Sequence, residues 1–166
     1  MTVRSKRIKM DVREAIELQA LLFQITTGLS RARHRELQGL GLSMIQSAVL
    51  WYIRRTPGAV SPAMIGQFCF REPNSVSQLL SRMEEKGVVE RIRDHKRNPQ
   101  NRSLIRVRLT EKGMKVYQQQ RDLNEVIPKI ISKLTPEEGD TLKRLLLKLR
   151  ESTFEALDER PRVSFP

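Results

Sequence analysis

Apolar residues recur at helical spacing along most of the 166-residue chain. In residues 11–38 they lie three, four or six positions apart, and this period predicts one long amphipathic helix that Gly39 and Gly41 end. Thr135-Pro136, a helix cap followed by proline at the first helical position, opens a final helix. The two stripes consist of Val12, Ala15, Ile16, Leu22, Ile25 and Leu29 in the first helix and Leu142, Leu145, Leu146 and Leu149 in the last.

Three shorter helices are predicted between these two. Ser43 is the expected cap of a helix over 44–55, and Ser61-Pro62 opens a short one that runs to about Phe70. Glu72 is the candidate cap of the third, which Gly87 closes. One face of this third helix is apolar and the other is small and polar: Val76, Leu79, Leu80 and Met83 against Asn74, Ser75, Ser77, Gln78, Ser81 and Arg82.

The segments 88–94 and 104–110 alternate with period two and predict a pair of strands. In the second strand Ile105, Val107 and Leu109 point one way and Arg106 and Arg108 the other. A further helix is expected to start at Thr110 and to run through Tyr117 and Leu123 to about Ile127, where Pro128 is expected to kink it.

This order of elements is that of a winged helix-turn-helix. The fold class expected is therefore mainly α with a small β-hairpin, in a single domain whose DNA-binding lobe spans 43–110. Long helices over 11–38 and 111–157 flank the lobe. Because their apolar stripes have few partners in a domain of this plan, we expect them to pack against a second copy of the chain; packing within one chain is the alternative.

The net charge of the chain indicates a polyanionic partner. The net charge is +12 and the pI is about 10.5, which favours nucleic acid first and an anionic membrane surface second, with plain solubility as the alternative. Between Arg91 and Arg108 there are seven basic residues and one acidic residue. With one cysteine, no secretory signal and no apolar run of spanning length, a reducing compartment is expected, by default the cytoplasm.

Short polar, amide and guanidinium side chains at the start of a helix suit the reading of base edges in the major groove. The candidate recognition residues are Asn74, Ser75, Ser77, Gln78 and Arg82. Ser61 is expected to offer its hydroxyl to a phosphate. The hairpin arginines and lysine are expected to contact phosphates and the minor groove: Arg93, Lys96, Arg97, Arg102 and Arg106. An ordinary solvated face is the alternative for both sets.

Two stretches resemble the MarR (multiple antibiotic resistance regulator) family of transcription regulators: NSVSQLLSRMEEKGVVER at 74–91 and NPQNRSLIRVRLTEKG at 98–113. The resemblance implies a homodimer with interlocked terminal helices and a palindromic site on double-stranded DNA. It also implies that Arg102 enters the minor groove and that Asn101 orients it. The chain departs from the family at Asn98 and Asn101, where the family usually has Asp, and at Ser103, where it often has a second Arg.

The resemblance further implies a small aromatic or anionic effector. The candidate effector pocket joins cationic and aromatic side chains: Arg33, His34, Trp51, Tyr52 and Arg55. A core position for Trp51 and a surface position for His34 are the alternatives. Cys69 is expected to be a small buried hydrophobe rather than an oxidant sensor. No metal-ligand spacing and no nucleophile–base pair is present, so neither a metal, nor a cofactor, nor enzyme activity is expected.

The sequence thus predicts a sequence-specific DNA-binding regulator, a ligand-responsive repressor that binds its operator as a homodimer. Two other classes stay open. One is a basic scaffold that binds an acidic protein or an anionic surface, and the other is an architectural protein that binds DNA without an operator.

Overall fold

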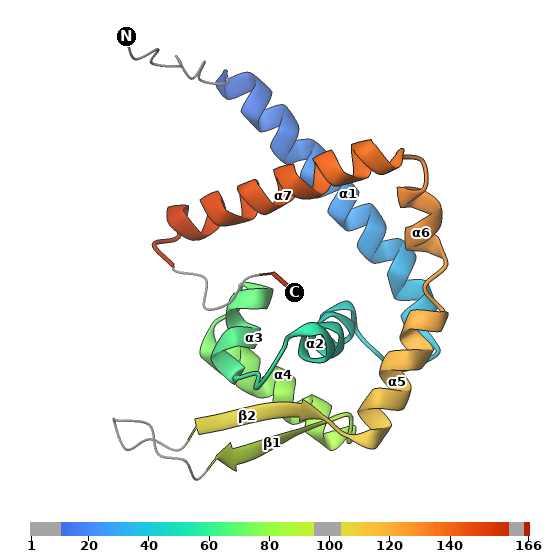
Figure 1. Ribbon diagram of the computed structural model, residues 1–166, viewed down its shortest axis with the longest axis vertical. Coiled ribbons are helices and arrows are strands. Elements are labelled where there is room, and N and C mark those ends of the chain that lie inside the picture. Colours follow the sequence, from blue (N-terminus) through green and yellow to red (C-terminus); the bar gives the residue numbers. More distant parts are fainter. Residues whose placement is uncertain (1–10, 95–103, 160–164) are drawn as a thin grey trace.

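The computed structural model describes residues 11–94, 104–159 and 165–166. The predicted order of a mainly helical winged helix-turn-helix is confirmed (Figure 1). The elements are α1 (Val12–Gln38), α2 (Met44–Arg55), α3 (Pro62–Cys69), α4 (Pro73–Glu85), β1 (Val89–Asp94), β2 (Leu104–Leu109), α5 (Glu111–Asp122), α6 (Val126–Ile131) and α7 (Pro136–Ala156).

The core lies where α2, α3 and α4 meet the hairpin. Leu50, Ile65, Leu80 and Met83 contribute side chains with no exposed surface. Val107 closes the core from the hairpin side, and its backbone N–H donates to the carbonyl oxygen of Val60 at 2.8 Å. The hairpin is therefore attached to the segment between α2 and α3 as well as to α4.

Three of the predicted helix caps are present. The hydroxyl oxygens of Ser43, Ser61 and Thr135 accept hydrogen bonds from backbone N–H groups in the first turns of α2, α3 and α7, at 3.3, 3.2 and 3.3 Å. Glu72 occupies the position before α4, but its side chain makes no cap hydrogen bond. The start of α4 is therefore set by Pro73 rather than by a side-chain cap.

The prediction of one helix from Thr110 to about Ile127 is wrong. α5 ends at Asp122, and Pro128 lies in the first turn of α6 instead of kinking a longer helix. The carboxylate of Glu36 in α1 accepts the backbone N–H groups of residues 125 and 126 at 3.1 and 3.0 Å. These N–H groups start α6, and a proline in the first turn has no N–H bond to lose.

The strand register distributes the arginines over both faces of the hairpin. Arg93 pairs with Ile105, and Arg106 pairs with Ile92. Because directly opposed residues share a face, Arg93 lies on the side of Ile105 and Val107, whereas Arg106 lies on the opposite side. Val107 is 3% exposed but Ile105 is 40% exposed, so the predicted apolar face is buried only toward its base.

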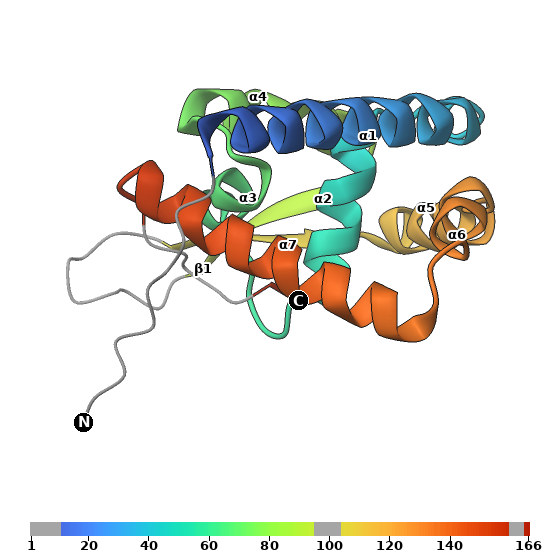
Figure 2. The same cartoon turned by 90° about the horizontal axis from the view of Figure 1, so that it is seen from above.

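The long helices α1 and α7 cross in one view but lie on opposite sides of α2 in the other (Figures 1 and 2). Their apolar stripes are exposed in the single protomer; Ile25 is 54% and Leu145 is 51% exposed. Exposed leucines in such a row on a long helix are typical of a surface that another chain covers. None of the helices in the described ranges combines the length and hydropathy needed to cross a membrane.

Candidate nucleic-acid interface

One face of α4 is buried and the other is open to solvent. Val76, Leu79, Leu80 and Met83 pack into the core. All five predicted recognition residues are exposed on the opposite side: Asn74, Ser75, Ser77, Gln78 and Arg82. The helix therefore presents amide, hydroxyl and guanidinium groups together, the combination that reads base edges.

α3 and α4 approach each other closely at the turn between them. A side chain at Gly66 would place its Cβ 3.0 Å from the carbonyl oxygen of Arg71 and 3.3 Å from Val76. Phe70 ends α3 in the left-handed conformation, with φ of 49°. Ser61 lies half-buried at the start of α3, and its hydroxyl oxygen already accepts the N–H of Met64, so only its proton is left for a phosphate.

The base of the hairpin is fastened to α4 by Arg91. Its backbone N–H and its Nε donate to the two carboxylate oxygens of Glu84 at 2.8 and 2.7 Å, and its Nη2 donates to Ser81 Oγ at 3.0 Å. The side-chain hydrogen bond from Arg91 lowers the pKa of Glu84 below its usual value. Arg91 is therefore a positioning residue that orients the hairpin relative to α4.

The exposed arginines of the hairpin lie on both faces of the strands. Arg108 donates through Nε to Glu90 at 2.7 Å on the exposed side of the strands. Arg93 and Arg106 are exposed, one on each face. The remaining predicted hairpin residues lie outside the described residues: Lys96, Arg97, Asn101 and Arg102.

A Leu-Thr-x-x-Gly motif at residues 109–113 joins the hairpin to α5. Thr110 Oγ1 donates to the carbonyl oxygen of Gly87 at 2.6 Å and accepts the N–H of Gly113 at 2.9 Å. A Cβ at Gly113 would lie 1.8 Å from the carbonyl oxygen of Val88. Glycine is required at this position because the backbone of α5 contacts that of Val88, the residue before β1.

A cavity of about 640 Å³, called here the central cavity, lies between α1, α2 and α5. It brings part of the predicted effector pocket together. Arg33, Trp51 and Arg55 line it. Tyr52 does not, because its side chain is 2% exposed and points into the core. His34 is also absent from the wall; its ring Nε2 lies 3.3 Å from the side-chain amide of Gln38 on the surface.

The cavity is also lined by residues that the sequence pattern did not indicate, among them Gln120 and Asn124. The side-chain oxygens Oε1 and Oδ1 of these two residues are buried and have no hydrogen-bond partner among the described residues. Gln120 is 4% exposed and is held in place because its Nε2 donates to the carbonyl oxygen of Ser47 at 3.3 Å. No local motif marks either residue, because only the packing of α5 on α2 brings them to the cavity.

The charge of Arg33 is compensated within the protein. Its guanidinium, which is almost fully buried, donates to the carboxylate of Glu36 and to the backbone carbonyl oxygen of Gln120. Burial raises the pKa of Glu36, but hydrogen bonds from Arg33 and from the backbone N–H groups at the start of α6 outweigh it and lower the pKa below its usual value. Arg33 therefore joins α1, α5 and α6. The other cations of the wall are Arg55 and Arg121, and Arg121 pairs with the carboxylate of Asp122 at 3.1 Å.

Cys69 ends α3 and is partly buried. Burial raises the pKa of its thiol to about 11, against an opposing effect of the nearby Arg71. Such a thiol is protonated and poorly nucleophilic at neutral pH. Within the described residues no cluster of three His, Cys, Asp or Glu side chains is arranged to hold a metal ion.

Comparison with known proteins places these features in a family. A model of the MarR family matches residues 40–97, which span α2 to the hairpin. Comparison with curated protein sequences finds no match.

Solved structures match over most or all of the chain. The organohalide-sensing transcriptional regulator RdhR-CbdbA1625 in its 2,4-dichlorophenol-bound form is 27% identical, with 100% of this chain and 98% of that one covered and a TM-score of 0.72. A cysteine-to-serine mutant of MarR from E. coli complexed with operator DNA is 26% identical, with coverage of 84% and 99% and a TM-score of 0.67. MepR from S. aureus in its DNA-binding conformation, 22% identical with coverage of 82% and 98%, shares the fold at a TM-score of 0.73.

The family match covers the α4 face and the first strand of the hairpin, and the solved regulators extend the similarity to the terminal helices. Regulators of this family are non-enzymatic. The match over α2 to the hairpin and the shared fold of the solved regulators make the chain similar to the MarR family of winged helix-turn-helix DNA-binding transcription regulators.

Proposed function

We propose that the protein is a homodimeric repressor that binds a palindromic operator and leaves it when a small effector occupies the central cavity. The observation that carries this proposal is the exposed polar face of α4, which lies beside a basic hairpin fastened to the same helix. A helix in this position reads the major groove while the hairpin contacts the backbone and the adjacent minor groove.

The side chains of α4 suit different parts of this task. Gln78 has the two-point donor and acceptor geometry that pairs with adenine, and Arg82 suits guanine or a phosphate. Ser61, at the start of α3, suits a phosphate contact. The similar mutant of MarR from E. coli is complexed with operator DNA, which supports DNA as the partner.

The dimer is supported by the exposed apolar stripes of α1 and α7. A second copy would bury both and would place two α4 helices on successive turns of one face of the duplex, as a palindrome requires. Leu145→Asp should shift the protein toward monomer in analytical ultracentrifugation, whereas Lys148→Asp on the same helix should not. A chain that sediments as a monomer without any substitution would refute the dimer.

The walls of the central cavity indicate the chemistry of the effector. Trp51 offers an aromatic wall and Arg55 a cation, while the buried oxygens of Gln120 and Asn124 require hydrogen-bond donors. These groups suit an aromatic molecule that carries a hydroxyl or N–H donor. The similar regulator with bound 2,4-dichlorophenol supports a ligand of this class. Since the cavity joins α1 to α2 and α5, its occupant acts on the separation of the two α4 helices.

The operator is tested by selecting duplexes from a random pool with the purified protein, followed by fluorescence anisotropy at fixed salt. Gln78→Ala should lose about 1–3 kcal/mol on the selected duplex and little on random DNA. Glu85→Ala, an exposed change at the far end of the same helix, is the matched control. Equal losses on both duplexes would indicate architectural binding, and failure to enrich any sequence would refute an operator.

The hairpin is tested in the same assay. Arg102→Ala should weaken operator binding about 10-fold or more, as expected for one well-placed contact of about 1–3 kcal/mol. Unchanged affinity would refute its assignment to the minor groove.

A further inference from the structure

Four of the five phenylalanines of the chain lie in one row of ring contacts that joins α7 and the chain end to the DNA-binding lobe. The row begins at Phe70 in the turn before α4, whose ring centroid lies 4.8 Å from that of Phe154 in α7. It ends at Trp51 in α2, whose ring centroid lies 5.6 Å from that of Phe165 and 6.0 Å from that of Phe68. Phe165 is the penultimate residue of the sequence.

Arg150 connects the two halves of this row. Its guanidinium carbon lies 4.8 Å from the centre of the Phe154 ring and 5.9 Å from that of Phe165. Both distances are within the range of cation–π attraction, and this interaction favours arginine over the ring face. Trp51 and Arg150 therefore form a slot for one aromatic ring, which Phe165 fills.

The slot matters because α7 has little other attachment to its own protomer. Phe154 is the only buried residue of α7, all of whose residues are described. Leu142, Leu145, Leu146 and Leu149 of α7 are exposed and are assigned above to the dimer. The end of α7 is thus held to the lobe by Phe154 and, through Arg150, by the ring of Phe165.

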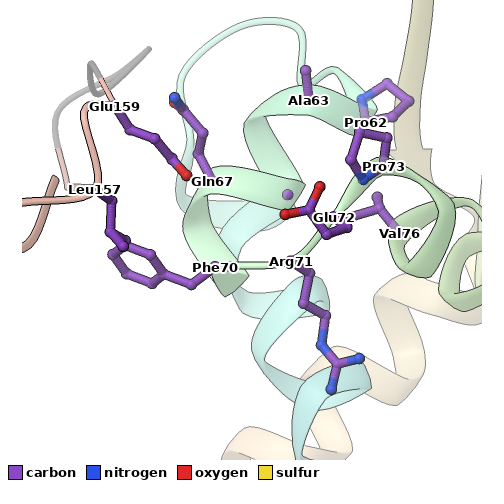
Figure 3. Close-up of a pocket in the computed structure, with 11 residues that line it drawn as sticks. Pro62, Ala63, Gln67, Phe70, Arg71, Glu72, Pro73, Val76, Leu157 and Glu159 are labelled. Atoms are coloured by element: carbon purple, nitrogen blue, oxygen red, sulfur yellow. The ribbon is translucent and has the colours of Figure 1, made fainter.

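The two ends of this row lie at the α3–α4 turn and at the central cavity, so the row connects these two places. Phe70 lies in the α3–α4 turn, where it lines a cleft together with Leu157, just past the end of α7 (Figure 3). Trp51 is also a wall of the central cavity. The same row therefore touches the turn that orients α4 and the wall that an effector contacts.

We propose that the Trp51–Arg150 slot is a binding site for an aromatic ring and that its resident ligand is the chain's own Phe165. The docked ring holds the end of α7 against the α3–α4 turn. An occupant of the central cavity that displaces Trp51 releases Phe165, and α7 then separates from the turn. This last step rests on the proposed effector function; the docking itself does not.

The docking is tested in the full-length protein without DNA or effector. Trp51 is the only tryptophan in the chain, so its fluorescence reports the slot directly. Phe165→Ala should shift the emission to longer wavelength and increase quenching by acrylamide. Phe165→Tyr, which keeps the ring, should match the unsubstituted protein, and Arg150→Gln should change the signal in the same direction as Phe165→Ala.

Hydrogen exchange gives a second readout at α7. Ring and cation–π contacts of this kind favour the docked state by about 10-fold, so the amides of residues 150–156 should exchange up to about 10-fold faster in Phe165→Ala. Faster exchange with red-shifted Trp51 would support the proposal. Unchanged Trp51 emission and quenching in Phe165→Ala, or equal effects of Phe165→Ala and Phe165→Tyr, would overturn it. If Phe165 is docked but no aromatic molecule releases the protein from DNA, the proposed effector function is refuted and the docking is not.

Discussion

The contact of Arg91 with Glu84 gives a prediction that can be worked from the geometry. Replacing Arg91 by Met keeps the length of the side chain but removes its hydrogen bonds to Glu84 and Ser81, at 2.7 and 3.0 Å. The backbone N–H of residue 91 still donates to Glu84. Both side chains of the pair are about one-third exposed (30% and 29%), so solvent screens part of the attraction.

We expect the Arg91→Met change to cost about 1 kcal/mol of unfolding free energy, between the values for exposed pairs and for charge-assisted bonds in the interior. Arg108→Met is the matched control on the neighbouring strand. Its partner is Glu90, and the two side chains are 65% and 42% exposed. That loss should be about 0.3 kcal/mol or less.

Urea unfolding followed by circular dichroism measures both losses. The protein concentration must be held constant, because assembly contributes to the apparent stability of a dimer. Equal losses for the two arginine variants would refute the view that the contact with α4, rather than charge in general, holds the hairpin.

The pH dependence follows from the lowered pKa of Glu84 in the folded state. A carboxylate with a lowered pKa contributes stability above its unfolded pKa, ordinarily 4.5, and loses it as the pH falls through the folded value. The difference in stability between the unsubstituted protein and Glu84→Gln should therefore be complete at pH 6–7 and should shrink at about pH 4 and below. A difference that is constant with pH would contradict the ionic contribution.

Three further predictions follow from the same structure. Gly113→Ala should destabilise the protein by about 2–4 kcal/mol in urea unfolding, because its Cβ would meet the Val88 carbonyl oxygen at 1.8 Å; Gly139→Ala, which has open space in α7, should be neutral or stabilising. The thiol of Cys69, with its pKa raised from 9.0 to about 11, should react with iodoacetamide at pH 8 about 100-fold more slowly than in urea, since each unit of pKa removes about tenfold of the thiolate. The logarithm of the operator association constant should fall steeply with the logarithm of salt concentration in anisotropy titrations, and a flat response would contradict binding through phosphates.

Much of the fold could be predicted from local signals. Ser43, Ser61 and Thr135 cap the predicted helices because a capping hydrogen bond spans only three residues and is therefore visible in the sequence. The two faces of α4 follow in the same way from the helical period, and all five candidate recognition residues are exposed as expected. The roles of these residues on DNA, like that of Arg102, stay predictions.

The local sequence signals failed to predict features that depend on contacts between distant segments. The break between α5 and α6 depends on Glu36, which is about ninety residues away in the chain and caps the start of α6. The central cavity acquires Gln120 and Asn124 and excludes Tyr52 for the same reason, since packing rather than residue type decides which side chains face one another. Trp51 meets both expectations in part, since it is partly buried against the core and also lines the cavity.

The sequence by itself determined the periods, the caps and the basic hairpin, because each of these depends on neighbours a few residues apart. Only the tertiary structure decided what these elements contact. It pairs Arg91 with Glu84, directs Arg93 and Arg106 to opposite faces, and joins Phe165 to Trp51. The physical reason is that strand register and side-chain packing are fixed by many weak contacts between distant segments, which no local pattern encodes.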